Sequence, residues 1–507
     1  MNGQIMKNRQ FAFGALLSYG AIAFNILSGL LYTPWMIRVV GDDQYALYAL
    51  AISVINLFLL DFGIGSSVTK FLSNYYARGQ YKEANRFMGI VYKVFFVISV
   101  VIAVVLLVFY FLIDGIYVKL TPTEIQTFKR LFVIVATYSV LSFPFTTFNG
   151  ILMANEQFIS VKACNFGQKV LNVALIVVAL LMGANVYALV LVNALSNILF
   201  IGIKYICIRR QTRLAVDFSH RDKTMAKELF GFSVWVTVMN LARRCMFNIM
   251  PSVIAALIGS AEVTIFSLAA SLEGYVYTFA DAINGMFLPK ISRILVREDA
   301  ERGLSALMCK VGRFHVATIG LIYLGFLCLG REFVLLWMGE GYELVYICTL
   351  LLISPALIYI PQQVAKTALL AKGIVKQQAM IYVGMAVANL SLSFILIPMF
   401  GIVGAAISVC VSYLLRTLMF NVLYRKKLGI DLGVYFRNAY GRWLVAAVAA
   451  LAFGWMVAKI PGLTGWVGLA VKIVLFTGIY GTFFIVFGVE KIERAALLER
   501  LHGGKKT

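Results

Sequence analysis

Long apolar runs separated by short polar loops constrain this sequence most. The runs are about 20 to 28 residues long, the length that an α-helix needs to cross roughly 30 Å of hydrocarbon. Strands of a membrane barrel would be about half as long and would alternate polar with apolar residues. The composition agrees, because 61% of the 507 residues are hydrophobic and only 13% are charged. The sequence therefore predicts an all-α integral membrane protein.

Fourteen transmembrane helices are expected from these runs. Their approximate ranges are 11–38, 45–69, 88–113, 131–154, 162–182, 185–206, 230–258, 263–289, 314–330, 345–371, 377–398, 402–424, 443–458 and 466–488. With a cytoplasmic N-terminus, about 31 Lys and Arg residues fall on the cytoplasmic side and about 5 on the other. One missed or invented helix would destroy this asymmetry, so it supports both the helix count and cytoplasmic termini.

The distribution of charge and the spacing of Cys and His residues argue against several kinds of partner and binding site. The net charge of +22 does not indicate a nucleic-acid partner, because the positive charges lie mostly in one alternate set of loops. The seven cysteines are scattered without a Cys-x-x-Cys, and the three histidines show no ligand spacing. We therefore expect no metal site, no disulfide framework and no cofactor.

An internal repeat organises the chain. DFGIGSSVTK at 61–70 and DAINGMFLPK at 281–290 both contain Asp, three residues, Gly, four residues and Lys. Other identical residues recur at one constant offset: Pro144 and Pro361, Ala154 and Ala371, Asn172 and Asn389. Since six helices separate the copies, both halves enter the membrane in the same direction, which predicts a parallel repeat with a pseudo-twofold axis along the membrane normal.

The repeat predicts the domain organisation. We expect an N-lobe of six helices at 1–210, a cytoplasmic loop at 211–229 and a C-lobe of six helices at 230–427. Two extra helices and a basic tail follow at 428–507. Two such lobes leave a cleft, and rocking one against the other exposes it to each side of the membrane in turn.

The repeated motif is interpreted as packing at an inner gate. A glycine four residues after each aspartate allows close helix approach, and each lysine lies near an inner helix end. The residues assigned to packing and the gate are Gly65, Lys70, Gly285 and Lys290. The alternative is that the two aspartates, Asp61 and Asp281, bind a coupling ion, H⁺ or Na⁺.

Charged residues inside the apolar runs form the candidate site, because a charge at mid-membrane costs about 2.5–3.5 kcal/mol and normally faces a partner or a wet cavity. Arg243 and Arg244 are adjacent, so their side chains diverge by about 100° and at most one points straight into a cleft. The other is expected to pair with a carboxylate, and Glu273 is at similar depth. Arg416 lies deep in its run, whereas Lys366, near an inner helix end, could either line the cleft or reach the interface. Unpaired cations in a cleft suit an anionic, phosphate-bearing substrate.

Three segments resemble a known family. GDDQYALYALAISVINLFLLDFGIGSSVTKFLSNYYARGQYKEANR (Gly41–Arg86) is similar to the second-helix region of Wzx-type polysaccharide flippases, the O-antigen and exopolysaccharide translocases of the multidrug/oligosaccharidyl-lipid/polysaccharide (MOP) exporter superfamily. FPFTTFNGILMANEQF (Phe143–Phe158) and LLWMGEGYE (Leu335–Glu343) also resemble this family. The resemblance covers about the first 430 residues, and the two extra C-terminal helices resemble those of lipid II flippases and of some polysaccharide exporters.

The resemblance implies a function and a site. Members of the family have two six-helix lobes around a cationic cavity and move an undecaprenyl-pyrophosphate-linked oligosaccharide to the outer leaflet of the bacterial cytoplasmic (inner) membrane. The pyrophosphate would contact Arg243 or Arg244, Arg416 and Lys366, while the lipid tail stays in the bilayer. The implied partners are this lipid-linked oligosaccharide, membrane lipid, a polysaccharide polymerase and a chain-length regulator.

Other functions stay open at this point. A cation-coupled multidrug antiporter would need the buried carboxylates Asp61 and Asp281, and a lipid II flippase would share the same fold. An enzyme is not expected, because a glycosyltransferase or polymerase needs a sizeable extramembrane region. The only Asp-Asp pair, Asp42-Asp43, lies in a very small outer loop, so no catalytic residues are assigned.

Overall fold

The computed structural model describes residues 2–58, 64–212, 214–219, 223–284, 288–295 and 298–488. Every regular element within these ranges is helical, which confirms the predicted all-α class. Nine helices among the described residues are long and apolar enough to cross a membrane, and a tenth span is a bent helix pair. The expected total of fourteen stays a prediction.

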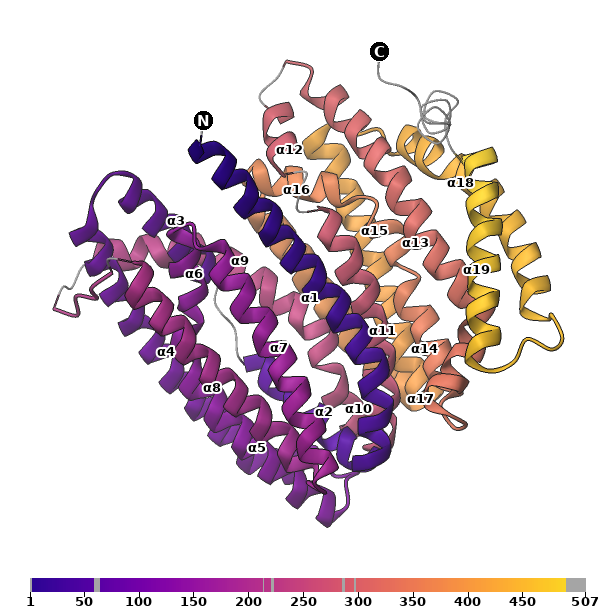
Figure 1. Cartoon of the computed structure of the whole chain (residues 1–507), viewed down its shortest axis with the longest axis horizontal. Helices are drawn as coiled ribbons and strands as arrows, with labels where there is room; N and C mark the ends of the chain where they lie inside the picture. The colour runs from indigo at the N-terminus through magenta and orange to yellow at the C-terminus, as the bar shows by residue number, and fades with distance from the viewer. Residues whose placement is uncertain are drawn as a thin grey trace. The chain divides into compact units, whose positions relative to one another are not determined.

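The chain divides into two compact units. Unit 1 comprises residues 1–267 and 382–401. Its elements are α1 (Asn2–Val40), α2 (Asp42–Phe58), α3 (Ile64–Ala77), α4 (Tyr81–Ile116), α5 (Pro122–Ser142), η1 (Phe143–Thr146), α6 (Thr147–Ala154), α7 (Phe158–Leu181), α8 (Val186–Gln211), α9 (Lys223–Asn248) and α10 (Met250–Leu257). Within it, α5 packs against both α4 and α8, and α7 packs against α1 and α8 (Figure 1).

Unit 2 comprises residues 268–381 and 402–507. Its elements are α11 (Ala261–Asn284), α12 (Leu288–Leu295), α13 (Ala300–Met338), α14 (Glu343–Ile353), α15 (Ala356–Tyr359), α16 (Gln363–Ala371), α17 (Val375–Leu428), α18 (Leu432–Ala458), α19 (Gly465–Phe483) and η2 (Phe484–Gly488), with the first residues of α11 and residues 382–401 of α17 in unit 1. The predicted lobe boundaries, near 210, 230 and 427, stay a prediction.

Several helices begin earlier than their apolar runs suggested. The helix expected to begin near 131 begins at Pro122, as α5. The Thr121 hydroxyl accepts a hydrogen bond from the Glu124 backbone N–H, and the Glu124 carboxylate accepts one from the Thr121 backbone N–H. This capping box, with Pro122 as the first helical residue, was a readable start signal. Hydropathy marks only the part of a helix that lies in hydrocarbon, so α13 also begins well before the expected 314.

The two helices expected at 377–398 and 402–424 are joined in α17. Gly401 interrupts the helical backbone there with φ 58° and ψ −139°. This positive φ is readily available only to glycine, and Pro398, three residues earlier, has no backbone N–H to donate. The chain therefore bends at the predicted junction without an intervening loop.

The C-terminal helices α18 and α19 pack along α13 in unit 2 (Figure 1). The Trp443 indole N–H donates to the Tyr480 hydroxyl (2.8 Å), which donates to the Ala317 carbonyl (2.7 Å). The buried Lys472 ammonium pairs with Glu332 at 2.8 Å. These contacts join the two added helices to the preceding bundle through polar groups that would be costly to leave unpaired in an apolar interior.

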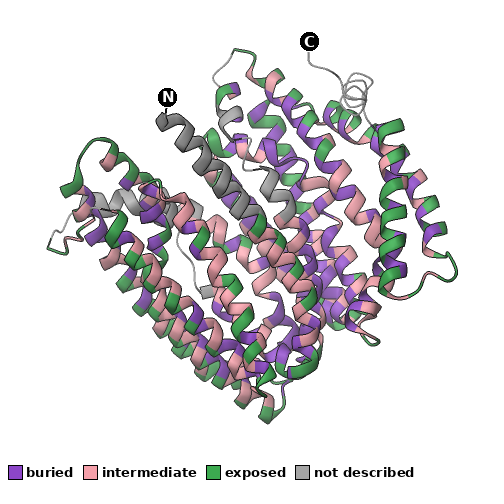
Figure 2. Cartoon of the chain, viewed as in Figure 1, coloured by how far each residue is buried: buried purple, intermediate pink, exposed green. Residues whose placement is uncertain are grey.

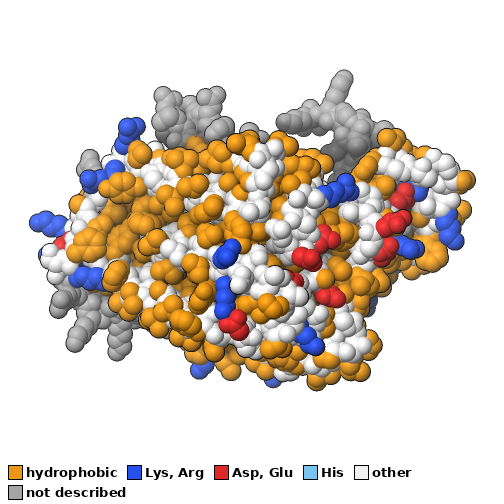
Figure 3. All heavy atoms as spheres, turned by 90° about the horizontal axis from the view of Figure 1, so that it is seen from below, with side chains coloured by type: hydrophobic (Ala, Val, Ile, Leu, Met, Phe, Trp, Pro, Cys, Tyr) orange, Lys and Arg blue, Asp and Glu red, His pale blue; other side chains and the backbone are white. Residues whose placement is uncertain are grey.

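The outward surface is strongly apolar. Along α4, the side chains of Phe96, Val97, Val100 and Phe111 are 67%, 61%, 48% and 70% exposed. Buried and exposed residues alternate around the helices in Figure 2, and hydrophobic side chains dominate the face shown in Figure 3. Such a surface would be a liability in water, whereas a bilayer solvates it. The chain is a multi-pass membrane protein.

Gly320 tests the packing of α13 on α18. A Cβ at this position would lie 2.6 Å from Trp443 Nε1, and the indole is held by its hydrogen bond to Tyr480. We expect Gly320→Ala to destabilise the protein by about 1–3 kcal/mol, the usual cost of overpacking. The measurement is the thermal midpoint of the purified protein in one detergent.

Gly441→Ala on α18 is the matched control, since a Cβ there meets nothing within 4 Å. This change should leave the midpoint unchanged or raise it, because alanine favours helix by about 0.5–1 kcal/mol over glycine. Equal midpoints for the two variants would contradict the proposed contact.

Candidate functional site

A buried arginine in unit 2 lies against two aromatic rings. The Arg416 guanidinium is 4.4 Å from the ring centroid of Tyr359 and 4.4 Å from that of Tyr413. The two rings stack with centroids 5.4 Å apart and planes 25° apart. Arg416 is only 6% exposed, so these contacts form with little water, where a cation–π interaction is worth about 2 kcal/mol.

A carboxylate completes this group of residues. Glu273, on α11, is 6% exposed, and its Oε1 accepts a hydrogen bond from the Tyr359 hydroxyl at 3.4 Å. Glu273 and Arg416 both contact Tyr359, so the two buried groups lie close together. Tyr359 thus contacts the cation through its ring and the anion through its hydroxyl. We name Glu273, Tyr359, Tyr413 and Arg416 the Arg416 cluster.

A broken helix carries Tyr359 of the Arg416 cluster. The segments Glu343–Tyr359 and Gln363–Ala371 are bent by 59° relative to each other, and Tyr359 is the last residue before the break. Pro361 lies within the break and cannot donate a backbone hydrogen bond. Its repeat partner Pro144 lies in η1, between α5 and α6. Irregular backbone at membrane depth occurs where it is buried in protein or lines a cavity, and discontinuous helices commonly carry transporter sites.

The other predicted cations have different surroundings. Arg243 is exposed on α9, and Arg244 is half-buried, with its Nη1 donating to the Asn56 carbonyl of α2 at 3.2 Å. Lys366 is half-buried on α16. Arg243 and Arg244 belong to unit 1 and Glu273 to unit 2, so the pairing predicted for them stays a prediction.

The repeated motif is described only in part. Asp61 and Gly285 lie outside the described residues, and Gly65 lies in α3. Asp281 and Lys290 belong to α11 and α12, but the positions of their side chains lie outside the described part. Lys70 is exposed on α3, with its ammonium 5.9 Å from the Phe71 ring centroid. The gate, packing and ion-coupling roles of these residues therefore stay predictions.

Sequence reasoning missed the two tyrosines of the cluster. Tyr413 stands three residues before Arg416, a spacing that places both on one face of a helix. Tyr359 stands two residues before Pro361. Both signals were available, but aromatic residues are abundant in this chain, and no spacing indicates which rings meet which cation. Among the described residues, no group of three His, Cys, Asp or Glu side chains could hold a metal ion.

A double-mutant cycle tests the electrostatic coupling within the cluster. Arg416→Gln and Glu273→Gln should each lower the free energy of unfolding, because each leaves a buried charge without its counter-charge. The double variant should cost less than the sum, with a coupling of about 0.5–3 kcal/mol. Thermal unfolding of the four purified proteins measures it.

Arg425→Gln combined with Glu273→Gln is the matched control pair. Arg425 is exposed on the same helix, nine residues after Arg416, which is about 13.5 Å along the axis. Its effect should add to that of Glu273→Gln. Additivity in both cycles would show that Arg416 and Glu273 do not interact.

Comparison with solved structures shows the fold. The chain superposes on the lipid II flippase MurJ in an inward closed conformation with a TM-score of 0.68 and 13% identity, covering 93% of this chain and 98% of that one. An inward-facing multidrug resistance MATE family transporter of the MOP superfamily gives a TM-score of 0.64 at 12% identity, covering 82% and 98%. A MOP superfamily transporter from Pyrococcus furiosus gives 0.60 at 12% identity, covering 82% and 94%. The fold is that of the MOP transporters.

Sequence comparison shows the family. A Shigella flexneri protein named "Putative O-antigen transporter" is 24% identical, over 77% of this chain and 92% of that one. A short match to the profile described as NADH-ubiquinone reductase complex 1 MLRQ subunit covers only residues 391–422, within the single helix α17. The profile described as polysaccharide biosynthesis protein matches residues 14–295, more than half of the chain. The chain therefore belongs to the polysaccharide biosynthesis protein family, and the proteins it resembles are named as transporters or flippases.

Proposed function

We propose that this protein is a flippase that moves an undecaprenyl-pyrophosphate-linked oligosaccharide from the cytoplasmic to the outer leaflet of the bacterial inner membrane. Membership of the polysaccharide biosynthesis family supports a glycan substrate. The name of the Shigella flexneri relative supports transport, and the likeness to a lipid II flippase supports a lipid-linked substrate. The glycan would then serve a polymerase and a chain-length regulator at the outer face.

The observation that carries the proposal is the buried guanidinium of Arg416, held by Tyr359 and Tyr413. A guanidinium is permanently charged and carries five N–H donors in a planar fork, which matches two phosphate oxygens at once. The ring contacts orient the fork without occupying its donors, because they use the π face. A pyrophosphate is therefore a suitable ligand for this cation.

Glu273 supplies a way to release the substrate. Its carboxylate and a bound pyrophosphate are both anions near Arg416, so each disfavours the other. A proton taken up by Glu273 would free Arg416 for the pyrophosphate, and loss of that proton would favour release. The protein would thereby couple transport to H⁺, with alternating access provided by movement of the lobes. Arg243, Arg244 and Lys366 would add positive charge along the path.

A cation-coupled multidrug antiporter is the second candidate. The buried carboxylate of Glu273 favours it, since an antiporter needs an acidic group that exchanges H⁺ or Na⁺ with a cationic drug. Such a protein would depend on Asp61 and Asp281 more than on Arg416. A lipid II flippase, the third alternative, would restore peptidoglycan synthesis in cells that lack their own.

Replacing Arg416 by Ala tests the proposal in cells. Without the charge-assisted contact to pyrophosphate, translocation should slow by about tenfold to a hundredfold. Lipid-linked repeat units should then accumulate on the inner leaflet. The measurement is the fraction of repeat units accessible to a lectin at the outer face of spheroplasts, at equal protein level.

Three controls separate the alternatives. Arg416→Lys should retain part of the activity because the charge remains, and Arg425→Ala should retain all of it. Asp61→Asn with Asp281→Asn should abolish drug efflux if the protein is an antiporter and leave glycan export largely intact if it is a flippase. Normal exposure of repeat units in cells that lack the protein would refute the flippase.

A further inference from the structure

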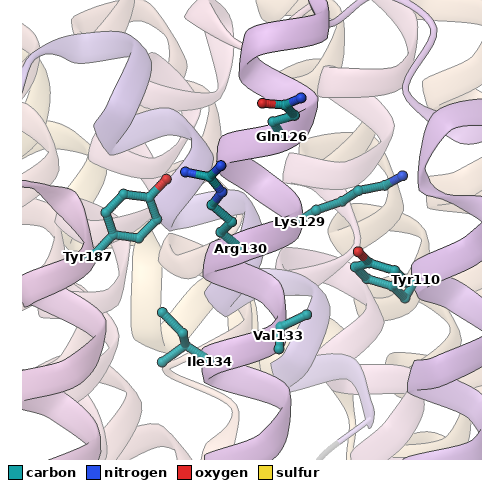
Figure 4. Close-up of a pocket in the computed structure, with 7 residues that line it drawn as sticks. All are labelled: Tyr110, Gln126, Lys129, Arg130, Val133, Ile134 and Tyr187. Atoms are coloured by element: carbon teal, nitrogen blue, oxygen red, sulfur yellow. The ribbon is translucent and has the colours of Figure 1, made fainter.

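A pocket at one end of α4, α5 and α8, in unit 1, is lined by two cationic and two aromatic side chains. Its volume is about 540 Å³, within the usual range for ligand sites. Lys129 and Arg130 of α5 line it together with Tyr110 of α4 and Tyr187 of α8 (Figure 4). In Figure 4 the Arg130 guanidinium extends toward Tyr187 and the Lys129 side chain toward Tyr110. None of these residues belongs to the Arg416 cluster.

The two cations are held differently. The Lys129 ammonium pairs with the Asp114 carboxylate at 2.5 Å and lies 5.4 Å from the centroid of the Tyr110 ring. Arg130 is exposed and makes no hydrogen bond or ion pair with the part of the chain that the structure describes. With Lys129 offset by Asp114, the pocket retains one net positive charge, carried by Arg130.

An apolar groove continues from this pocket. A second cavity of about 380 Å³ runs between α4 and α5 and shares Tyr110 and Val133 with the first. Its lining includes Leu107 and Leu141, whose side chains are 57% and 68% exposed, so it opens sideways toward the surrounding hydrocarbon. The polar pocket and the groove together complement an amphiphilic molecule, because one part is positively charged and the other is apolar.

We propose that this composite site binds one monoanionic glycerophospholipid. Its phosphodiester contacts Arg130, with Gln126 and the Tyr187 hydroxyl as further hydrogen-bonding groups, and one acyl chain lies in the α4–α5 groove. A single free positive charge complements a phosphodiester, which carries one negative charge, better than a pyrophosphate, which carries more. Anionic lipid headgroups are commonly bound in basic pockets between transmembrane helices. Tyrosines are also common at the membrane interface, where the headgroups lie.

The position of the site agrees with this ligand. It lies where α4 ends and α5 and α8 begin, on the side that the distribution of Lys and Arg predicts to be the outer one. The site is therefore expected to take lipid from the outer leaflet, beside the N-lobe. The inference does not rest on the proposed flippase activity.

Lipid titration followed by native mass spectrometry tests the proposal. Full-length protein in detergent is titrated with phosphatidylglycerol and, separately, with phosphatidylcholine of the same acyl chains. We expect one phosphatidylglycerol to bind at least tenfold more tightly than phosphatidylcholine. Arg130→Gln should weaken phosphatidylglycerol about tenfold or more and remove the preference, because it deletes the charge-assisted contact.

Two further variants make the test specific. Lys119→Gln removes an exposed positive charge from the same connecting region but outside the pocket, and should leave the affinity unchanged. Ala136→Phe fills the apolar groove and should weaken both lipids, with the thermal midpoint in lipid-free detergent confirming that each variant is folded.

Several results would overturn the proposal. These are equal affinity for the two lipids, an unchanged affinity in Arg130→Gln, or an equal loss in Lys119→Gln. Competition by glycerol phosphate at the same concentration as the lipid would show that the site takes a free phosphate and that the groove contributes nothing.

Discussion

A permanent charge inside an apolar helical protein must find partners within that protein, and this constraint determines which groups surround Arg416. Its guanidinium contacts two tyrosine rings, and the carboxyl group of Glu273 accepts a hydrogen bond from one of these tyrosines. Tyr359 connects Arg416 with Glu273, because its ring contacts the guanidinium and its hydroxyl donates a hydrogen bond to the carboxyl group. Such an arrangement lowers the cost of burying the cation, because the ring faces and the carboxyl group replace part of the hydration that it would have in water.

The helix that carries Tyr359 is broken around Pro361. A continuous helix would direct Tyr359 and the residues after the break along one straight axis, whereas the 59° bend ends the helix at Tyr359. Pro144 marks a corresponding interruption in unit 1. The repeat therefore preserves an interruption as well as a hydrophobic pattern, and within unit 2 the interruption directly follows Tyr359 of the Arg416 cluster.

Much of this protein could be predicted from the sequence. The helical class and the membrane location followed from run lengths, the junction between residues 398 and 402 from the ends of two apolar runs, and the family from the resemblance of motifs. The candidate cations were also identified, because any charge in an apolar run is conspicuous. Helix starts were less accurate, as for α5, since the polar first turns lie outside hydrocarbon and the capping box was overlooked.

The sequence by itself determined that this chain spans a membrane as helices, because hydrophobic length and charge distribution are local properties. Its polysaccharide family was indicated by the resemblance of three short segments, which are also local. Only the tertiary structure decided which groups meet. Glu273, Tyr359 and Arg416 come from α11, α15 and α17, and their contact depends on how each helix is rotated about its axis. The same holds for Arg130 and Tyr187, which share a pocket because α5 packs on α8. Rotation and packing arise from the whole set of side-chain contacts, so no single segment encodes them.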